Sequence, residues 1–211
     1  SQWMPDPVMI EIEPEQVTVD TIEQKVYAVA GREKFRLVYN LLQQPEFKRV
    51  LIFGNRRDDT QRLAENLKRH GVPCELLTGA VMQTRRLHIL EDFRTGKIPV
   101  VVATDVAGRG LHIDNITHVI NYDFPYEPED YVHRIGRTGR AGVKGVAISF
   151  ACESESFIIP DIEQYIGRPL SCAVPEEALL RPPPRPAQGP SAKSRSAPDR
   201  VPRRSDRGRR R

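Results

Sequence analysis

The chain has 211 residues, of which 39% are hydrophobic and 28% are charged, and its formal net charge is +4. This length fits one domain with additional segments. The sequence contains neither an apolar stretch of about 18 residues, as a membrane span requires, nor a signal-peptide pattern, so we expect a cytoplasmic protein without a membrane partner.

The first 20 residues contain three prolines and no clear period. Residues 8–10 could form an edge strand or lie extended, and we favour the extended path. Beyond them, short apolar runs predict strands at 25–29, 50–53, 74–77, 100–103, 119–120 and 145–150. Helical patterns alternate with these runs at 32–42, 58–70, 83–93 and 128–135, and again near residue 160. Such alternation over short connections predicts an α/β domain with a parallel sheet and helices on both faces.

The positive charge lies at the end of the chain. Residues 181–211 hold eleven Lys and Arg against two Asp, a net charge of +9, which leaves −5 for residues 1–180. The same segment has seven prolines and no aromatic residue, too little apolar surface to offset the entropy lost on folding. We therefore predict a leader over 1–20, a folded domain over 21–180 and a disordered basic tail over 181–211.

Cys74, Cys152 and Cys172 are odd in number and widely spaced. Such a set fits neither a disulfide framework nor a zinc site, and it predicts unpaired thiols.

The run H-R-I-G-R-T-G-R, residues 133–140, lies at the end of the helix predicted over 128–135. Its Arg137 and Arg140 are three residues apart, which puts both guanidinium groups on one face of a helical turn. Gly136 and Gly139 leave room for a phosphate to approach. Because a planar fork of donors suits a phosphoryl group in transfer, we interpret the two arginines as arginine fingers. The alternative is a solvated basic face, which the interleaved glycines disfavour.

Four further segments precede this run in order: L-I-F at 51–53, Q-T-R-R at 83–86, T-D-V-A-G-R-G-L-H-I at 104–113 and N-Y-D-F-P at 121–125. Together the five segments resemble motifs IV, IVa, V, the segment after V, and VI of the DEAD-box RNA helicases. The resemblance covers residues 24–167 and implies a RecA-like fold. The chain lacks both the G-x-x-x-x-G-K-[ST] phosphate loop and the Asp-Glu-Ala-Asp metal site. The resemblance therefore implies the second lobe of a longer two-lobe enzyme whose first lobe binds ATP and holds Mg²⁺.

The resemblance also implies roles for single residues at the nucleotide. Arg137 and Arg140 would act on ATP as catalytic arginine fingers, with Gly110 and His112 beside the cofactor. Most of the family has Asp where this chain has His112, and that Asp contacts the ATP ribose. A neutral imidazole offers one donor and one acceptor, so a ribose contact can survive the change.

By the same resemblance, Asp123 and His133 would contact the first lobe when the two lobes close.

RNA contacts are implied for Arg86, Thr104 and the amide of Gly110, all to phosphates. Because phosphate contacts carry no base information, RNA should bind without sequence preference. Two alternatives remain open. Arg86 could instead pair with a carboxylate such as Glu91 or Asp92, and Thr104 could cap a helix.

The variant Leu111-His112-Ile113, the surroundings of Cys152 and the Arg-rich tail resemble the bacterial RhlB branch of the family. That resemblance implies the endoribonuclease RNase E as a partner in an RNA-degrading assembly, the degradosome. Two other functions compete: a DNA-directed superfamily 2 helicase lobe, and a scaffold-docking and RNA-binding module without a catalytic contribution. Helicases of the RecQ type have Gln where this chain has His133, which tells against the first. The presence of both Arg137 and Arg140 tells against the second.

Overall fold

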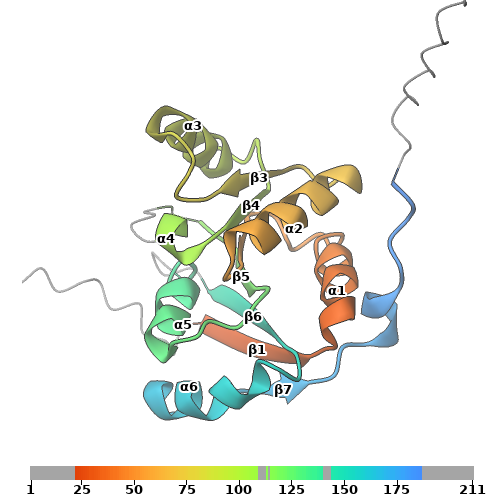
Figure 1. Cartoon of the computed structure of the whole chain (residues 1–211), viewed down its shortest axis with the longest axis vertical. Helices are drawn as coiled ribbons and strands as arrows, with labels where there is room; N and C mark the ends of the chain where they lie inside the picture. The colour runs from red at the N-terminus through yellow and green to blue at the C-terminus, as the bar shows by residue number, and fades with distance from the viewer. Residues whose placement is uncertain (1–21, 109–112, 114, 140–143, 187–211) are drawn as a thin grey trace, which may run out of the picture.

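The computed structural model describes residues 22–108, 113, 115–139 and 144–186 (Figure 1). Residues 8–10 of the leader and most of the predicted tail lie outside these described residues. The strands are β1 (Ile22–Ala28), β2 (Val50–Phe53), β3 (Cys74–Leu77), β4 (Val100–Ala103), β5 (His118–Asn121), β6 (Gly145–Ala151) and β7 (Cys172–Ala173). The α-helices are α1 (Lys34–Leu41), α2 (Arg57–Arg69), α3 (Gln83–Arg94), α4 (Asp105–Gly108), α5 (Pro128–Ile135) and α6 (Ile159–Ile166). Short 3-10 turns lie at η2 (Gly31–Glu33), η3 (Ser156–Ile158) and η4 (Glu177–Leu180).

The strands form one parallel sheet in the order β3-β4-β2-β5-β6-β1-β7. The RecA-like α/β fold is thereby confirmed. Because all strands run in the same direction, the loops that follow β2, β4 and β5 meet at one edge of the sheet, the place where open α/β sheets bind ligands.

Side chains alternate between two cores, as the period of a strand requires. On one face, Val50 and Ile52 pack with Leu63 and Leu67 of α2 in a core that also includes α1. On the other face, the neighbouring Leu51 packs with Ile89 and Phe93 of α3, whereas α5 and α6 cover β1 and β6. Helices therefore cover both faces of the sheet (Figure 1).

The segment after α6 closes the edge of the sheet at β1. Strand β7 pairs with Val26 and Tyr27, and Leu179 and Leu180 then pack on the core beside α1. Asn40 of α1 holds this segment, because its Nδ2 donates to the carbonyl oxygens of Leu179 (2.8 Å) and Arg181 (2.9 Å).

All three cysteines are unpaired, as predicted. Cys74 is buried, and this burial raises the pKa of its thiol to about 11. Within the described residues, no helix combines the length and the apolar character needed to cross a membrane.

Candidate functional site

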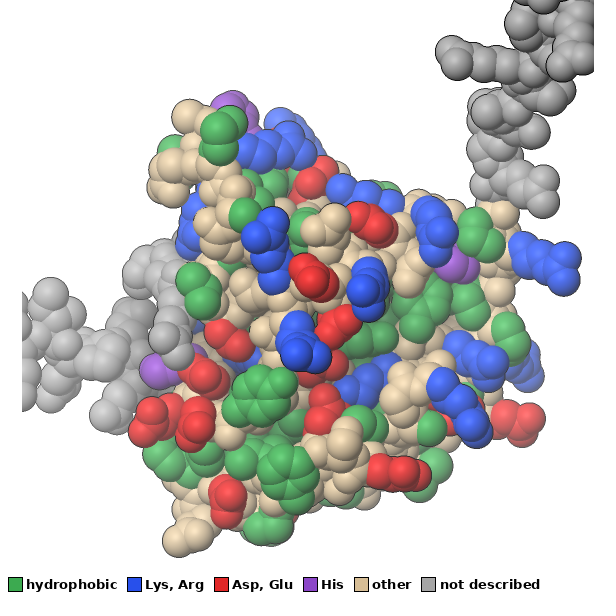
Figure 2. Space-filling view, viewed as in Figure 1, with side chains coloured by type: hydrophobic (Ala, Val, Ile, Leu, Met, Phe, Trp, Pro, Cys, Tyr) green, Lys and Arg blue, Asp and Glu red, His purple; other side chains and the backbone are tan. Residues whose placement is uncertain are grey.

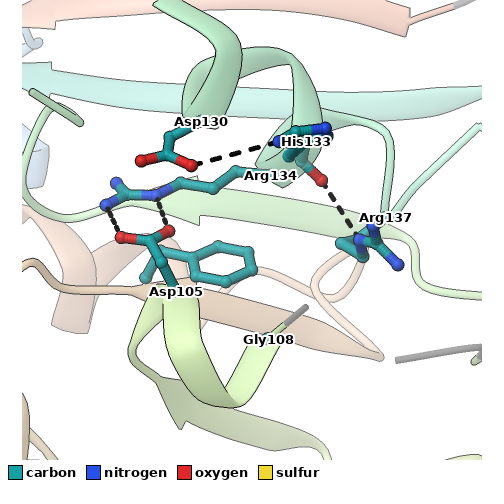
Figure 3. A pocket seen from close by; sticks show the side chains of 7 residues that line it. Asp105, Gly108, Asp130, His133, Arg134 and Arg137 are labelled. Atoms are coloured by element: carbon teal, nitrogen blue, oxygen red, sulfur yellow. Dashed lines mark hydrogen bonds and ion pairs between the residues drawn. The ribbon is translucent and has the colours of Figure 1, made fainter. Parts of the chain in front are cut away.

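Arg134 of α5 organises the carboxyl edge of the sheet. Only 2% of the surface of this residue is exposed. The guanidinium group holds Asp105 with two bonds, from Nε to Oδ1 (2.6 Å) and from Nη2 to Oδ2 (2.7 Å) (Figure 3). This planar, two-bond arrangement is specific to arginine.

The same guanidinium group reaches two other strand ends. Nη1 donates to the carbonyl oxygen of Asp123 after β5 (2.7 Å), and Nη2 donates to Oδ1 of Asn55 after β2 (2.6 Å). The ring of Phe53 lies beneath it, with its centroid 5.4 Å from Cζ. Arg134 therefore fixes α5 to the ends of β2, β4 and β5.

Arg137 lies just beyond α5 and lines a small pocket. It is partly exposed, and its Nε donates to the carbonyl oxygen of His133 (3.1 Å) (Figure 3). His133 is exposed, with Nδ1 4.0 Å from Oδ1 of Asp130. The other residues that line the pocket belong to β2, α4 and α5: Phe53, Asp105, Gly108, Asp130 and Arg134. The predicted finger Arg137 and the predicted inter-lobe residue His133 thus share one pocket on the carboxyl edge.

The turn that carries Arg137 is tightly fixed. The hydroxyl of Thr138, a buried residue, donates to the carbonyl oxygen of Ile116 (2.5 Å). Gly139 has a φ of +71°, a conformation that side chains disfavour. The backbone requirement is thus a second reason for this glycine, beside the approach of a phosphate.

Thr104 and Arg86 meet at helix α4. Thr104 is buried directly before α4, and its carbonyl oxygen accepts bonds from the amides of Ala107 (3.0 Å) and Gly108 (2.8 Å). Arg86 of α3 donates from Nη2 to the carbonyl oxygen of Ala107 (2.8 Å). The alternative partners expected for Arg86 are otherwise engaged, since Glu91 pairs with Arg94 and Asp92 with Lys97. The structure therefore brings both predicted RNA contacts to one short helix.

Asp123, predicted to face the first lobe, has partners within this domain. Its Oδ2 accepts a bond from the amide of Asn55 (3.1 Å), and its Oδ1 lies 3.4 Å from Nζ of Lys34. Lys34 is buried, and its Nζ also donates to Oε2 of Glu155 at 2.5 Å. A buried ammonium needs such pairing because desolvation penalises an isolated charge.

Three predicted site residues, Gly110, His112 and Arg140, lie outside the described residues. Four residues that the sequence analysis did not single out complete the site: Lys34, Asn55, Asp105 and Arg134. A signal for Arg134 was available, because it lies between the apolar residues Tyr131 and Ile135 on the buried side of α5. Among the described residues, no group of three or more His, Cys, Asp or Glu could hold a metal ion.

The domain thus combines a parallel sheet with the turn after α5 that carries Arg137, beside a helix that Arg134 anchors. Residues 33–142 match the model of the helicase conserved C-terminal domain, and the chain belongs to this family. The resemblance to the second lobe of DEAD-box helicases, and to the RhlB branch, is confirmed by the relatives described next.

The chain is 54% identical to the ATP-dependent RNA helicase RhlB of Pseudomonas putida over 184 residues, which are 87% of this chain and 46% of that protein. It is 44% identical to RhlB of Shewanella frigidimarina over 186 residues, 88% of this chain and 43% of that protein. The chain thus spans less than half the length of these relatives.

Two solved structures show the same fold. The Escherichia coli DEAD-box protein SrmB, bound to the regulator of ribonuclease activity A, is 34% identical with a TM-score of 0.69, covering 79% of this chain and 95% of that one. Dbp5 of Saccharomyces cerevisiae, bound to RNA and ADP BeF3, is 32% identical with a TM-score of 0.68, covering 74% of this chain and 42% of that one.

Proposed function

We propose that this chain is the second lobe of an ATP-dependent DEAD-box RNA helicase. In that enzyme, ATP binds between this lobe and a first lobe that supplies the phosphate loop and the Mg²⁺ ligands. Arg137 and Arg140 reach the transferring phosphoryl group as arginine fingers. The observation that carries this proposal is the position of Arg137, which lies at the carboxyl edge of the sheet, just beyond the helix that buried Arg134 holds in place.

The proposal gives each finger an electrostatic role. Charge spreads over three oxygens as the phosphoryl group transfers, and a fixed guanidinium group stabilises this charge without reorganising. Arg137 lines the pocket at the carboxyl edge of the sheet, and its Nε donates to the carbonyl oxygen of His133. Gly110 and His112 would lie beside the nucleotide, His112 at the ribose.

RNA binds on the α4 side of the lobe in this proposal. Arg86, Thr104 and the Gly110 amide contact phosphates, so the lobe binds without sequence preference. Helix α4 connects the two functions, because Arg86 bonds to Ala107 and Asp105 bonds to Arg134. A shift of α4 on RNA binding would therefore be transmitted to α5 and its fingers. Dbp5, a structural neighbour, binds RNA and ADP BeF3 together.

Closure brings His133 against the first lobe, and its exposed ring supports this role. Asp123 has a larger part within its own lobe, where it binds Asn55 and Lys34; we propose that its remaining lone pairs meet the first lobe. The closed enzyme would bend one RNA strand and part a duplex locally. By its likeness to RhlB we assign it to RNA degradation in the cytoplasm, in a degradosome with RNase E.

ATP turnover by the purified 211-residue chain directly tests the proposal that this lobe holds only one side of the ATP site. The chain holds no phosphate loop and no Asp-Glu-Ala-Asp segment, so we expect no turnover, with or without RNA. Turnover that rises with added RNA, and that co-purifies with the chain, would show that this lobe alone contains a complete site.

A further inference from the structure

Two large aromatic side chains are exposed on the segments that precede α5 and α6. Tyr126, in the loop before α5, is 69% exposed, and Phe157 of η3 is 72% exposed. They border a shallow apolar pocket whose other lining residues come from the same two loops: Phe124, Pro125, Ser154, Glu155 and Ile158. We call this set the aromatic patch. Large exposed aromatics around a pocket are characteristic of protein–protein contacts.

The aromatic patch is surrounded by negative charge. The two segments that form it and its flanks, residues 122–133 and 152–166, contain eight Asp and Glu and no Lys or Arg. Figure 2 shows acidic side chains around apolar ones in the region where Figure 1 places α5 and α6. Asp123 and Glu155 are paired with Lys34, but Glu127, Glu153 and Asp161 are exposed.

The apolar pocket and its acidic rim together indicate which kind of ligand the aromatic patch can bind. The negative rim repels the phosphates of RNA, so the patch is not an extension of the RNA site. An apolar pocket with an acidic rim matches a segment that presents an apolar side chain between positive charges. We propose that the aromatic patch docks a basic segment of a partner protein, with one apolar side chain inserted between Tyr126 and Phe157. The proposal does not depend on the ATPase function.

Two other occupants fit this chemistry less well. The basic tail of this chain offers arginines, but residues 187–211 contain no aromatic residue and a single branched aliphatic one, Val201, as an anchor. The first lobe would meet His133, in the last turn of α5, and Arg137, just beyond that helix, whereas Tyr126 lies before its first turn. A separate protein therefore fits the patch best.

The probe is a short fluorescein-labelled peptide in which arginines flank a central Trp-Leu pair. Anisotropy measures its binding to the 211-residue chain. We expect saturable binding that weakens about tenfold when Ser replaces Trp and Leu, as for loss of an interface anchor. A peptide with Glu in place of Arg should not bind. Phe157→Ser and Tyr126→Ser should each weaken binding about fivefold or more. Val174→Ser is the matched control, because Val174 is 79% exposed but follows β7, outside the patch.

Equal unfolding temperatures of all variants would show that the substitutions act at the surface. The proposal is overturned if no peptide binds. It is also overturned if the affinity stays the same when Ser replaces the Trp-Leu pair, or when both Tyr126 and Phe157 are substituted. Much tighter binding by a chain that ends at Pro186 would instead assign the patch to the tail. Loss of binding in the two-lobe protein, closed with RNA and a nucleotide analogue, would assign it to the first lobe.

Discussion

Replacing Arg134 by Ala should destabilise the domain more than any other single change at the site. The substitution leaves the Asp105 carboxylate, the Asn55 amide oxygen and the Asp123 carbonyl oxygen without their buried donor. Removal of one partner of a buried ion pair costs about 3–5 kcal/mol. The Asp105 side chain is 24% exposed and can be hydrated, so we expect the lower end, about 3 kcal/mol. For a domain of this size, that loss lowers the midpoint of thermal unfolding by about 6–12 °C.

Calorimetry of the 211-residue chain measures this shift, and Arg137→Ala is the matched control. Arg137 lies three residues further along the chain, where it is partly exposed and its Nε donates to the carbonyl oxygen of the exposed residue His133. Its loss should cost less than about 1 kcal/mol. The unfolding temperature of Arg134→Lys should lie between those of the two alanine variants, because lysine keeps the positive charge but lacks the planar set of donors. The assignment of Arg134 as the anchor is refuted if Arg134→Ala unfolds within about 2 °C of the parent chain, or if Arg137→Ala is equally destabilising.

Three further predictions concern RNA binding and pH. In the two-lobe protein, Arg86→Ala should weaken RNA binding and reduce the slope of log affinity against log salt by about 0.7, the value for one phosphate contact. Arg85 pairs with Glu75, so the control variant Arg85→Ala should change neither the affinity nor the slope. Equal effects of the two substitutions would contradict a phosphate contact specific to Arg86. Ending the chain at Pro186, beyond the bonds from Asn40, should lower RNA affinity and flatten its salt dependence at an unchanged unfolding temperature, and unaltered affinity would place RNA binding wholly on the lobe. Burial lowers the pKa of His118, which stacks on Phe47, so the unfolded chain binds a proton first: this contribution to stability is complete above about pH 6.5 and declines as the pH falls below that value. The unfolding temperature of His118→Phe should therefore fall less between pH 7.5 and pH 5 than that of the parent chain, and parallel curves would contradict the buried, neutral imidazole.

The regular elements were largely predictable because local sequence determines them. Strands β2, β3 and β4 have the predicted bounds, since each is a short apolar run between polar or Pro- and Gly-containing segments. Helix α5 also has its predicted bounds, because Pro128 is favoured at the first helical position. Strand β1 begins at Ile22, earlier than predicted, because it pairs along its whole length with β6. Helix α4 is too short to show a period.

The site was only partly predictable, because its contacts join residues far apart in the chain. The motifs predicted roles for Arg137, Arg86 and Thr104, and the apolar neighbours Tyr131 and Ile135 could have marked Arg134 as buried, but the sequence does not say which groups Arg134 binds. Only the fold brings Asp105 and Asn55 to Arg134, and Glu155 to Lys34 across 121 positions. The bond from Arg86 to Ala107 has the same origin, because α3 and α4 follow neighbouring strands β3 and β4.

The central claim is that this lobe completes an ATPase site with Arg137 and Arg140. Its most direct test is RNA-stimulated ATP turnover by the two-lobe protein with either residue changed to Ala. Loss of a finger should lower turnover by about 10³-fold or more, with RNA binding in the absence of nucleotide unchanged. Lysine should not restore turnover, because it lacks the planar fork. Near-normal turnover in either alanine variant would contradict the account and return that arginine to a structural role.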